Sequence, residues 1–252
     1  VDGGRHSATA TAIEPTTVLL LRRNDLAGLI SRKHQTAFAI KRGIAGIVCG
    51  RLRVHLAALA GSLGDAEADD RSTDGAIGQA RDGAGGRVAD QPSLPEGLEF
   101  CGPPDSGYVQ RLATFRAFDS LALWGFLTAG RYVRCPPGKE LIAEGSTPSA
   151  CFLTMNGAVE KVIIRGRRRI RVGLAGPGQA FGYESLIDHR PAPTTAATRE
   201  RTLLLMLPRL AFDRLFYEET DGSHVFIDVI NRDVVASLRQ VLRPQARLAS
   251  SR

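Results

Sequence analysis

Cysteine is scarce in this chain, and the few that occur lie far apart. Cys49, Cys101, Cys135 and Cys151 are separated by 52, 34 and 16 positions, so there is no CxxC pair or close cluster. Structural zinc and iron–sulfur centres are held by such clusters. Histidine is also sparse, and His189 is the only one between residues 132 and 195. We therefore predict no metal site, either of these kinds or of the multi-histidine kind found in cupin-like enzymes.

The chain also lacks recognisable motifs of enzymes and of membrane insertion. There is no Walker loop, no paired dinucleotide fingerprint and no recognisable Ser/His/Asp arrangement. No apolar run approaches the roughly 18–20 residues that a membrane span needs. Residues 1–12 have no apolar core of the kind found in signal peptides. We predict a non-enzymatic, cytoplasmic protein with no membrane partner.

One segment has too few apolar residues to fold. Residues 62–107 contain nine Gly, four Pro and ten acidic residues against three Arg, a composition that cannot bury enough apolar surface to become ordered. We predict a flexible acidic linker between an N-terminal part (1–61) and a C-terminal domain (108–243), which is followed by a basic tail (244–252). The linker carries a net charge of −7 and the chain +7, so the remaining residues carry +14.

What the chain does have is a series of short apolar runs between turn signals. The runs include 152–155, 158–164 and 170–174, and glycine-containing turns at 138, 145, 157, 166 and 176–178 separate them. Such spacing is typical of short antiparallel strands in a barrel or jelly roll. Asn156-Gly157 predicts a tight hairpin. The Arg-rich turn at 165–171 predicts a second hairpin, either merely solvated or in contact with an anion or nucleic acid.

In their order, these motifs resemble the cyclic nucleotide-binding domain of cyclic-AMP receptors, fumarate/nitrate regulators and regulatory kinase subunits. The matching residues begin at Tyr132, continue through Gly138, Glu144-Gly145 and Phe152-Leu153, and reach Gly176-Pro177-Gly178 and Phe181-Gly182. The resemblance implies a mainly β fold with flanking helices, a double-stranded β-helix jelly roll. It also implies a phosphate-binding cassette that begins at Phe181-Gly182.

The cassette departs from the family pattern at its two charged positions. The resemblance implies a glutamate directly after the glycine, for the ribose hydroxyl, and an arginine further on that clamps the cyclic phosphate. Tyr183 stands at the first position, with Glu184 one residue late, and Ala192 stands at the second. Arg190 is close, but Pro191 and Pro193 restrict the backbone around it.

A repeat is the second finding. Residues 7–29 align without gaps to residues 193–215, an offset of 186 positions, and eight of 23 pairs are identical. Both segments lead into amphipathic helices, predicted over 38–59 and 224–242. The chain is thus predicted to hold the C-terminal part of a first roll-like domain and one complete copy. The strands that would pair with residues 7–23 do not precede them, so we expect unpartnered strands from a longer tandem protein.

These patterns predict a regulatory or sensory module without catalytic activity, whose ligand is a small anion such as cyclic AMP. Only about ten residues follow Leu242, too few for a helix-turn-helix, so we expect no sequence-specific DNA binding. Helix 224–242 either packs on its own roll or forms a homodimer. The alternatives are a transcription regulator without its DNA-binding domain and a structural or oligomerisation module that binds no nucleotide. The predicted site residues are Phe181, Gly182, Tyr183, Glu184, Ser185, Leu186, Arg190, Thr194, Thr195 and Ala196, with Arg5, His6, Ser7, Ala8 and Thr9 in the partial copy.

Overall fold

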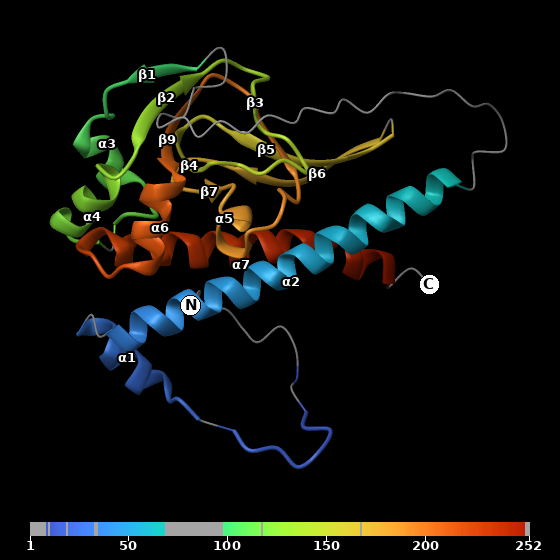
Figure 1. The fold of residues 1–252 in the computed structure, drawn as a ribbon, viewed down its shortest axis with the longest axis horizontal. Helices are drawn as coiled ribbons and strands as arrows, with labels where there is room; N and C mark the ends of the chain where they lie inside the picture. Colours follow the sequence, from blue (N-terminus) through green and yellow to red (C-terminus); the bar gives the residue numbers. More distant parts are fainter. Residues whose placement is uncertain are drawn as a thin grey trace.

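The structure is a computed structural model that describes residues 9, 11–18, 20–32, 35–68, 98–116, 118–166 and 168–249. Its C-terminal part is a jelly roll of two antiparallel sheets with flanking helices, as the sequence predicts (Figure 1). The elements in chain order are α1 (Arg23–Ser31), α2 (Gln35–Ala68), β1 (Glu99–Cys101), α3 (Ser106–Arg111), α4 (Ser120–Leu127), β2 (Arg131–Cys135), β3 (Glu140–Ile142), β4 (Ala150–Asn156), β5 (Val159–Arg165), β6 (Arg168–Ala175), β7 (Ala180–Phe181), α5 (Glu184–Asp188), β8 (Thr195–Thr198), β9 (Thr202–Pro208), α6 (Arg209–Tyr217) and α7 (Asp221–Ala249).

The two sheets enclose one core, and the helices enclose a second. Sheet A has the strand order β1-β2-β9-β4-β7, and sheet B has β3-β8-β5-β6. Side chains from both sheets, among them Phe152 and Leu204 of sheet A and Val159 of sheet B, form the inner core. Their neighbours along the same strands point the other way and pack against the helices, because successive strand residues face opposite sides. We call this second cluster the helix-side core.

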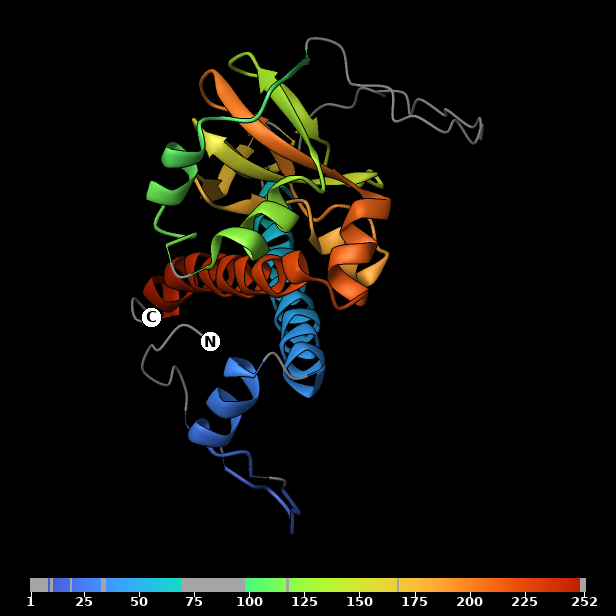
Figure 2. The same ribbon diagram turned by 90° about the vertical axis from the view of Figure 1, so that its left-hand side faces the viewer.

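Helix α7 runs along the base of the roll, and α2 crosses it (Figures 1 and 2). The buried face of α7 includes Val225, Phe226, Val229, Ile230 and Val234. The helix contacts α2, α4, α6 and the strands β6 and β7. The apolar stripe predicted for residues 224–242 therefore packs within this chain, on its own roll and on the helices around it.

Helix α2 is long, and it is amphipathic where it meets α7. Phe38, Ala45, Cys49, Leu52 and Leu56 form its buried stripe. By length and composition alone, its segment Gln35–Ser62 would also be able to cross a membrane, and 28% of the apolar window is buried inside the structure. The sequence-based statement that no apolar run approaches this length therefore needs qualification. Charged residues interrupt the run without lowering its average hydropathy below that of a span.

A predicted hairpin and a predicted strand do not form, each for a physical reason. Asn156-Gly157 does not make a hairpin, because β4 pairs in sheet A and β5 in sheet B. Instead Gly157, at φ 86°, lets the chain cross between the sheets. The strand expected within residues 7–23 is absent from the described residues there, since no neighbouring strand pairs with them.

The predicted linker is ordered at both of its ends. Helix α2 runs into it as far as Ala68, and β1 pairs with β2 through Phe100 and Val133. This short edge strand was hidden by the glycines and prolines around it. Residues 69–97 lie outside the described part of the chain. At the other end of the domain, α7 continues through Pro244 to Ala249, so most of the predicted tail is helical.

Gly222 allows the start of α7 to approach α4 closely. A Cβ at this position would lie 2.6 Å from the backbone nitrogen of Phe126, and a helix backbone cannot move aside as a flexible side chain can. We predict that Gly222→Ala lowers the free energy of unfolding by roughly 1–3 kcal/mol, the usual cost of overpacking. Denaturant titration of the full chain measures it.

The matched control is Gly50→Ala in the middle of α2, where an added Cβ meets nothing within 4 Å. Alanine is a better helix former than glycine by about 1 kcal/mol. The control should therefore be neutral or stabilising. Equal losses for the two variants would contradict the close approach of α7 and α4.

Candidate functional site

The cassette, residues 181–196, begins where β7 ends. Phe181 stacks on Phe152 inside the roll, with ring centroids 5.3 Å apart. Gly182 follows at φ 79°, and a Cβ there would lie 2.4 Å from Cδ1 of Ile142. Glycine is thus required twice, for its backbone conformation and for space. The turn directs the chain into the short helix α5.

The residues that follow Gly182 face two different parts of the molecule. Tyr183 is fully buried and belongs to the helix-side core. Glu184 and Ser185 line a small cavity on the inner side. The position that resembles the ribose-binding carboxylate thus holds a tyrosine that packs against the helices. Burial, together with neighbouring Glu184 and Asp233, raises the pKa of this tyrosine well above its ordinary value.

The inner cavity beside the cassette has a volume of about 10 Å³, room for about one water molecule. Lys161 of β5 forms part of its wall, and only 7% of this residue is exposed. Gly173, its partner on β6, makes space for the side chain, because a Cβ there would lie 2.8 Å from Cε of Lys161. The Lys161 Nζ donates a hydrogen bond to Ser237 Oγ of α7 at 2.8 Å. The ammonium group is thus tied to α7.

The structure brings some of the predicted site residues together and leaves others out. Thr194 and Ala196 line the inner cavity with Ala192, which is buried in the inner core. Thr195 faces the other way, and its Oγ1 accepts a hydrogen bond from the Glu144 backbone nitrogen at 3.0 Å. Leu186 is buried in the helix-side core. Some of the predicted site residues therefore line the cavity. Thr195 instead bonds to the backbone of Glu144, and Leu186 packs in the helix-side core.

Arg190, the arginine nearest to the expected clamp position, lies outside the cavity. Arg190 is exposed and does not line the cavity. The backbone around it is held by Pro191 and by a hydrogen bond from the Arg190 backbone nitrogen to Asp188 Oδ1 at 3.2 Å. In the partial copy, Arg5, His6, Ser7 and Ala8 lie outside the described residues, and Thr9 is exposed.

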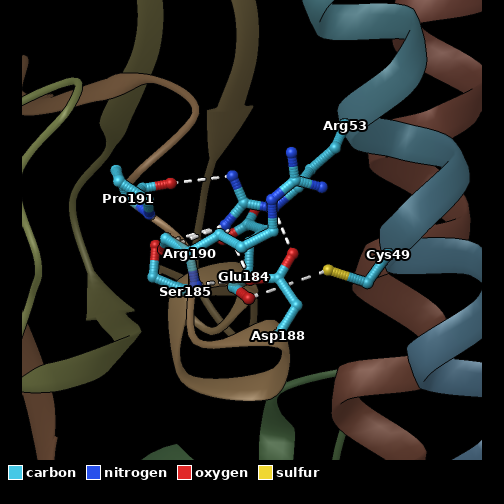
Figure 3. A network of polar contacts seen from close by, with 7 residues as sticks. All are labelled: Cys49, Arg53, Glu184, Ser185, Asp188, Arg190 and Pro191. Carbon is cyan, nitrogen blue, oxygen red and sulfur yellow. Dashed lines mark hydrogen bonds and ion pairs between the residues drawn. The ribbon is translucent and has the colours of Figure 1, made fainter.

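A contact that sequence reasoning missed holds the outer side of the cassette (Figure 3). Arg53 of α2 forms an ion pair with Asp188, the last residue of α5. It also donates to the backbone carbonyls of Pro191 at 2.7 Å and Arg190 at 3.3 Å. Cys49 lies one turn earlier on α2, with its Sγ 4.0 Å from the carbonyl oxygen of Glu184. No local signal marks Arg53, because the contact joins segments about 135 positions apart.

The arginine-rich hairpin and an apolar groove both lie away from the inner cavity. Arg165 and Arg169 form ion pairs with Glu144 and Glu160, while Arg167 is outside the described residues. A groove of about 750 Å³ runs between α3, α4 and β2 and is lined mostly by apolar residues, including the exposed Trp124. All four cysteines are free thiols, and three of them are buried.

Comparison with known proteins agrees with the resemblance seen in the sequence. Residues 132–219, which hold the β-roll from β2 to β9 together with α5 and α6, match the family model described as cyclic nucleotide-binding domain. The match covers this segment and does not extend to the N-terminal helices or to α7.

Individual relatives are distant. The potassium channel KAT1 of Arabidopsis thaliana is 26% identical over 94 residues, which are 37% of this chain and 14% of the channel. A cyclic nucleotide-binding domain from Methylobacillus flagellatus is 20% identical, with a TM-score of 0.49, over 57% of this chain and 85% of that one. The c-di-GMP responsive global regulator CLP of Xanthomonas campestris is 20% identical, with a TM-score of 0.47, over 52% of this chain and 65% of that one.

Asp233 connects α7 to the roll just before the cassette. Its Oδ2 accepts a hydrogen bond from the backbone nitrogen of Ala180 at 2.6 Å. Burial raises the pKa of this carboxyl from 3.8 to about 7, against the opposing effects of the Ala180 hydrogen bond, Lys161 and Arg232. The folded protein therefore keeps a proton between about pH 4 and 7 that the unfolded chain releases. The stabilisation is complete below pH 4 and is lost as the pH rises towards 7.

We predict that Asp233→Asn removes this part of the pH dependence. Relative to the variant, the unaltered chain should lose stability on the order of a few kcal/mol between about pH 4 and 7. Asparagine keeps an oxygen that can accept the Ala180 hydrogen bond. Denaturant titrations at several pH values measure the difference, with Glu200→Gln as an exposed carboxyl control. Parallel stability profiles for the unaltered chain and Asp233→Asn would contradict the assignment.

Proposed function

We propose that residues 108–243 are a non-catalytic regulatory module whose inner cavity does not bind cyclic nucleotides strongly. The observation that carries the proposal is the small size of the cavity at the cassette, which has about 10 Å³ of space and Lys161 in its wall. A cyclic nucleotide needs many times the volume of one water molecule. It would enter only after Lys161 and the cassette had moved.

The charge pattern of the cassette supports the same proposal. A small apolar residue, Ala192, stands where the resemblance implies an arginine, and Arg190 is outside the cavity. A hydrogen bond to a charged group contributes roughly 1.5–3 kcal/mol, so its loss weakens binding by about one to two decades. Lys161 lines the cavity, but its ammonium bonds to Ser237 of α7 and lacks the planar fork that matches a phosphate.

We also propose that α7 is the element that reports the state of the roll. It contacts the cassette strand through the Asp233 carboxylate and Ala180, and it contacts β5 through Ser237 and Lys161. A movement of the cassette that breaks these bonds would change how α7 is held. The predicted homodimer through residues 224–242 remains a prediction. Helix α2 of the same chain already covers part of that helix, so a second chain would have to bind the remaining surface.

The proposal of a tandem arrangement is supported by the helices. Helices α1 and α6 each have nine residues, and they begin at Arg23 and Arg209, 186 positions apart. Helices α2 and α7 begin at Gln35 and Asp221, again 186 positions apart. This is the offset at which the sequence repeats. The N-terminal segment is thus proposed to be the end of a first copy.

The proposal predicts that calorimetric titration of the full chain with cyclic AMP or cyclic GMP gives no saturable heat up to about 100 µM. The double variant Lys161→Ala, Ala192→Arg should then gain affinity for cyclic AMP by about tenfold or more, because it frees volume and supplies the phosphate fork. Lys161→Ala alone separates the two effects, and thermal melts check that each variant folds. Micromolar binding by the unaltered chain would refute the proposal of a closed cavity.

A second prediction distinguishes the DNA-binding alternative. The sequence predicts no sequence-specific DNA binding, while the residues outside 62–107 carry a net charge of +14. We expect mobility-shift titrations with duplex DNA to show, at most, binding that disappears with increasing salt and does not depend on sequence. Site-selective binding that persists at physiological salt would instead favour the transcription regulator.

A further inference from the structure

The outer face of the cassette is built to receive an arginine from another segment. Residues 188–191, which we call the cassette loop, follow α5 and contain His189 in a left-handed conformation at φ 56°. The loop presents the Asp188 carboxylate and the carbonyl oxygens of Arg190 and Pro191 towards α2 (Figure 3). Carbonyls arranged in this way need a donor with several N–H groups. A guanidinium group meets that requirement.

Arg53 supplies this donor and is nearly buried in doing so. Its side chain is 10% exposed. Its Nη2 donates to Asp188 Oδ1 at 2.8 Å, its Nε to Asp188 Oδ2, and its Nη1 to the Pro191 carbonyl oxygen at 2.7 Å. The two nitrogens on one carboxylate form the bidentate arrangement that is the stronger type of ion pair. The contact thus fixes the position of the loop as well as neutralising its charge.

Helix α2, which carries Arg53, is held in place by polar and apolar contacts with other elements. Lys41 pairs with Asp228 of α7 at 2.7 Å, and Asn231 Nδ2 donates to the Lys41 carbonyl oxygen at 3.0 Å. Further along α2, the buried Cys49, Leu52 and Leu56 belong to the helix-side core. The polar contacts near Lys41 and the Arg53 contact lie on the same helix, about three turns apart. A displacement of α2 would therefore also remove the Arg53 contacts from the cassette loop.

The next residues tie this loop to the inner cavity. Ala192 lines the cavity, and its backbone nitrogen donates to the Ser146 carbonyl oxygen at 2.7 Å. Ser185, which lies 3.5 Å from Arg53 Nη2, lines the same cavity from the side of α5. Any widening of the cavity that moves α5 or residues 188–192 must therefore stretch or break the Arg53 contacts.

We propose that Arg53 is a latch through which the N-terminal segment holds the cassette of the C-terminal domain closed. The partner that fits the outer face of the cassette is helix α2, and its docking controls whether the inner cavity opens. This inference rests on the proposed function only in that the inner cavity is the regulated site. Displacement of α2 would free the loop from outside, without a ligand in the cavity.

Hydrogen exchange of the full chain, followed by mass spectrometry, tests the latch. In Arg53→Gln the amides of residues 184–192 should exchange about tenfold faster or more, because the loop loses its outer donors. Arg53→Lys should give a smaller increase, since it keeps the charge without the fork. The matched control is Arg51→Gln, the same change of charge at an exposed position two residues earlier on α2. It should leave these amides unchanged.

The outcomes are distinct. Faster exchange in residues 184–192, alone or together with α2, supports the latch. Equal exchange in Arg53→Gln and Arg51→Gln overturns it, and so does an equal increase throughout β4 and β9, which would indicate general destabilisation. The charge swap Arg53→Asp with Asp188→Arg should restore part of the protection that either single change removes. Cyclic AMP titration of the unaltered chain judges the proposed function separately, because the exchange experiment needs no ligand.

Discussion

Sheet A buries apolar side chains on both faces, and the positions of the other elements depend on this. Phe152 and Leu204 face the inner core, while Leu153 and Leu205 beside them face the helices. A strand that is apolar on both sides needs cover on both sides. Sheet B covers one face, and α4, α6 and α7 cover the other. The cassette connects sheet A to sheet B, so its residues are shared between the two cores.

This division explains how a family motif can persist while its charged positions change. Phe181 and Gly182 are fixed by packing, since one stacks on Phe152 and the other leaves room for Ile142. Tyr183 fills space between the sheet and the helices. None of these roles requires a ligand. The retained residues therefore maintain the fold, and the residues that would bind a phosphate are free to vary.

The fold was largely predictable from the sequence, and the site was predictable only in part. Short apolar runs and glycine turns predicted the roll, and the 3.6-residue spacing of apolar residues predicted α2 and α7. Register and sheet membership were less accessible, as Asn156-Gly157 shows, because a turn signal does not say which strands pair. Lys161 and Arg53 were not identified at all. Their roles depend on a bulged pairing in sheet B and on a contact between distant segments, which local patterns do not contain.

The positions of the cations show how the cassette differs from the pattern it resembles. In that pattern an arginine reaches a phosphate from within the cassette, so the ligand holds the loop from inside. In this chain Lys161 occupies the inner side and bonds to Ser237 of α7, while Arg53 holds the loop from the outer side. Both cations bond to the protein itself. The outer side of the loop is thus bonded within the protein, and under our proposal α2 sets the position of the loop.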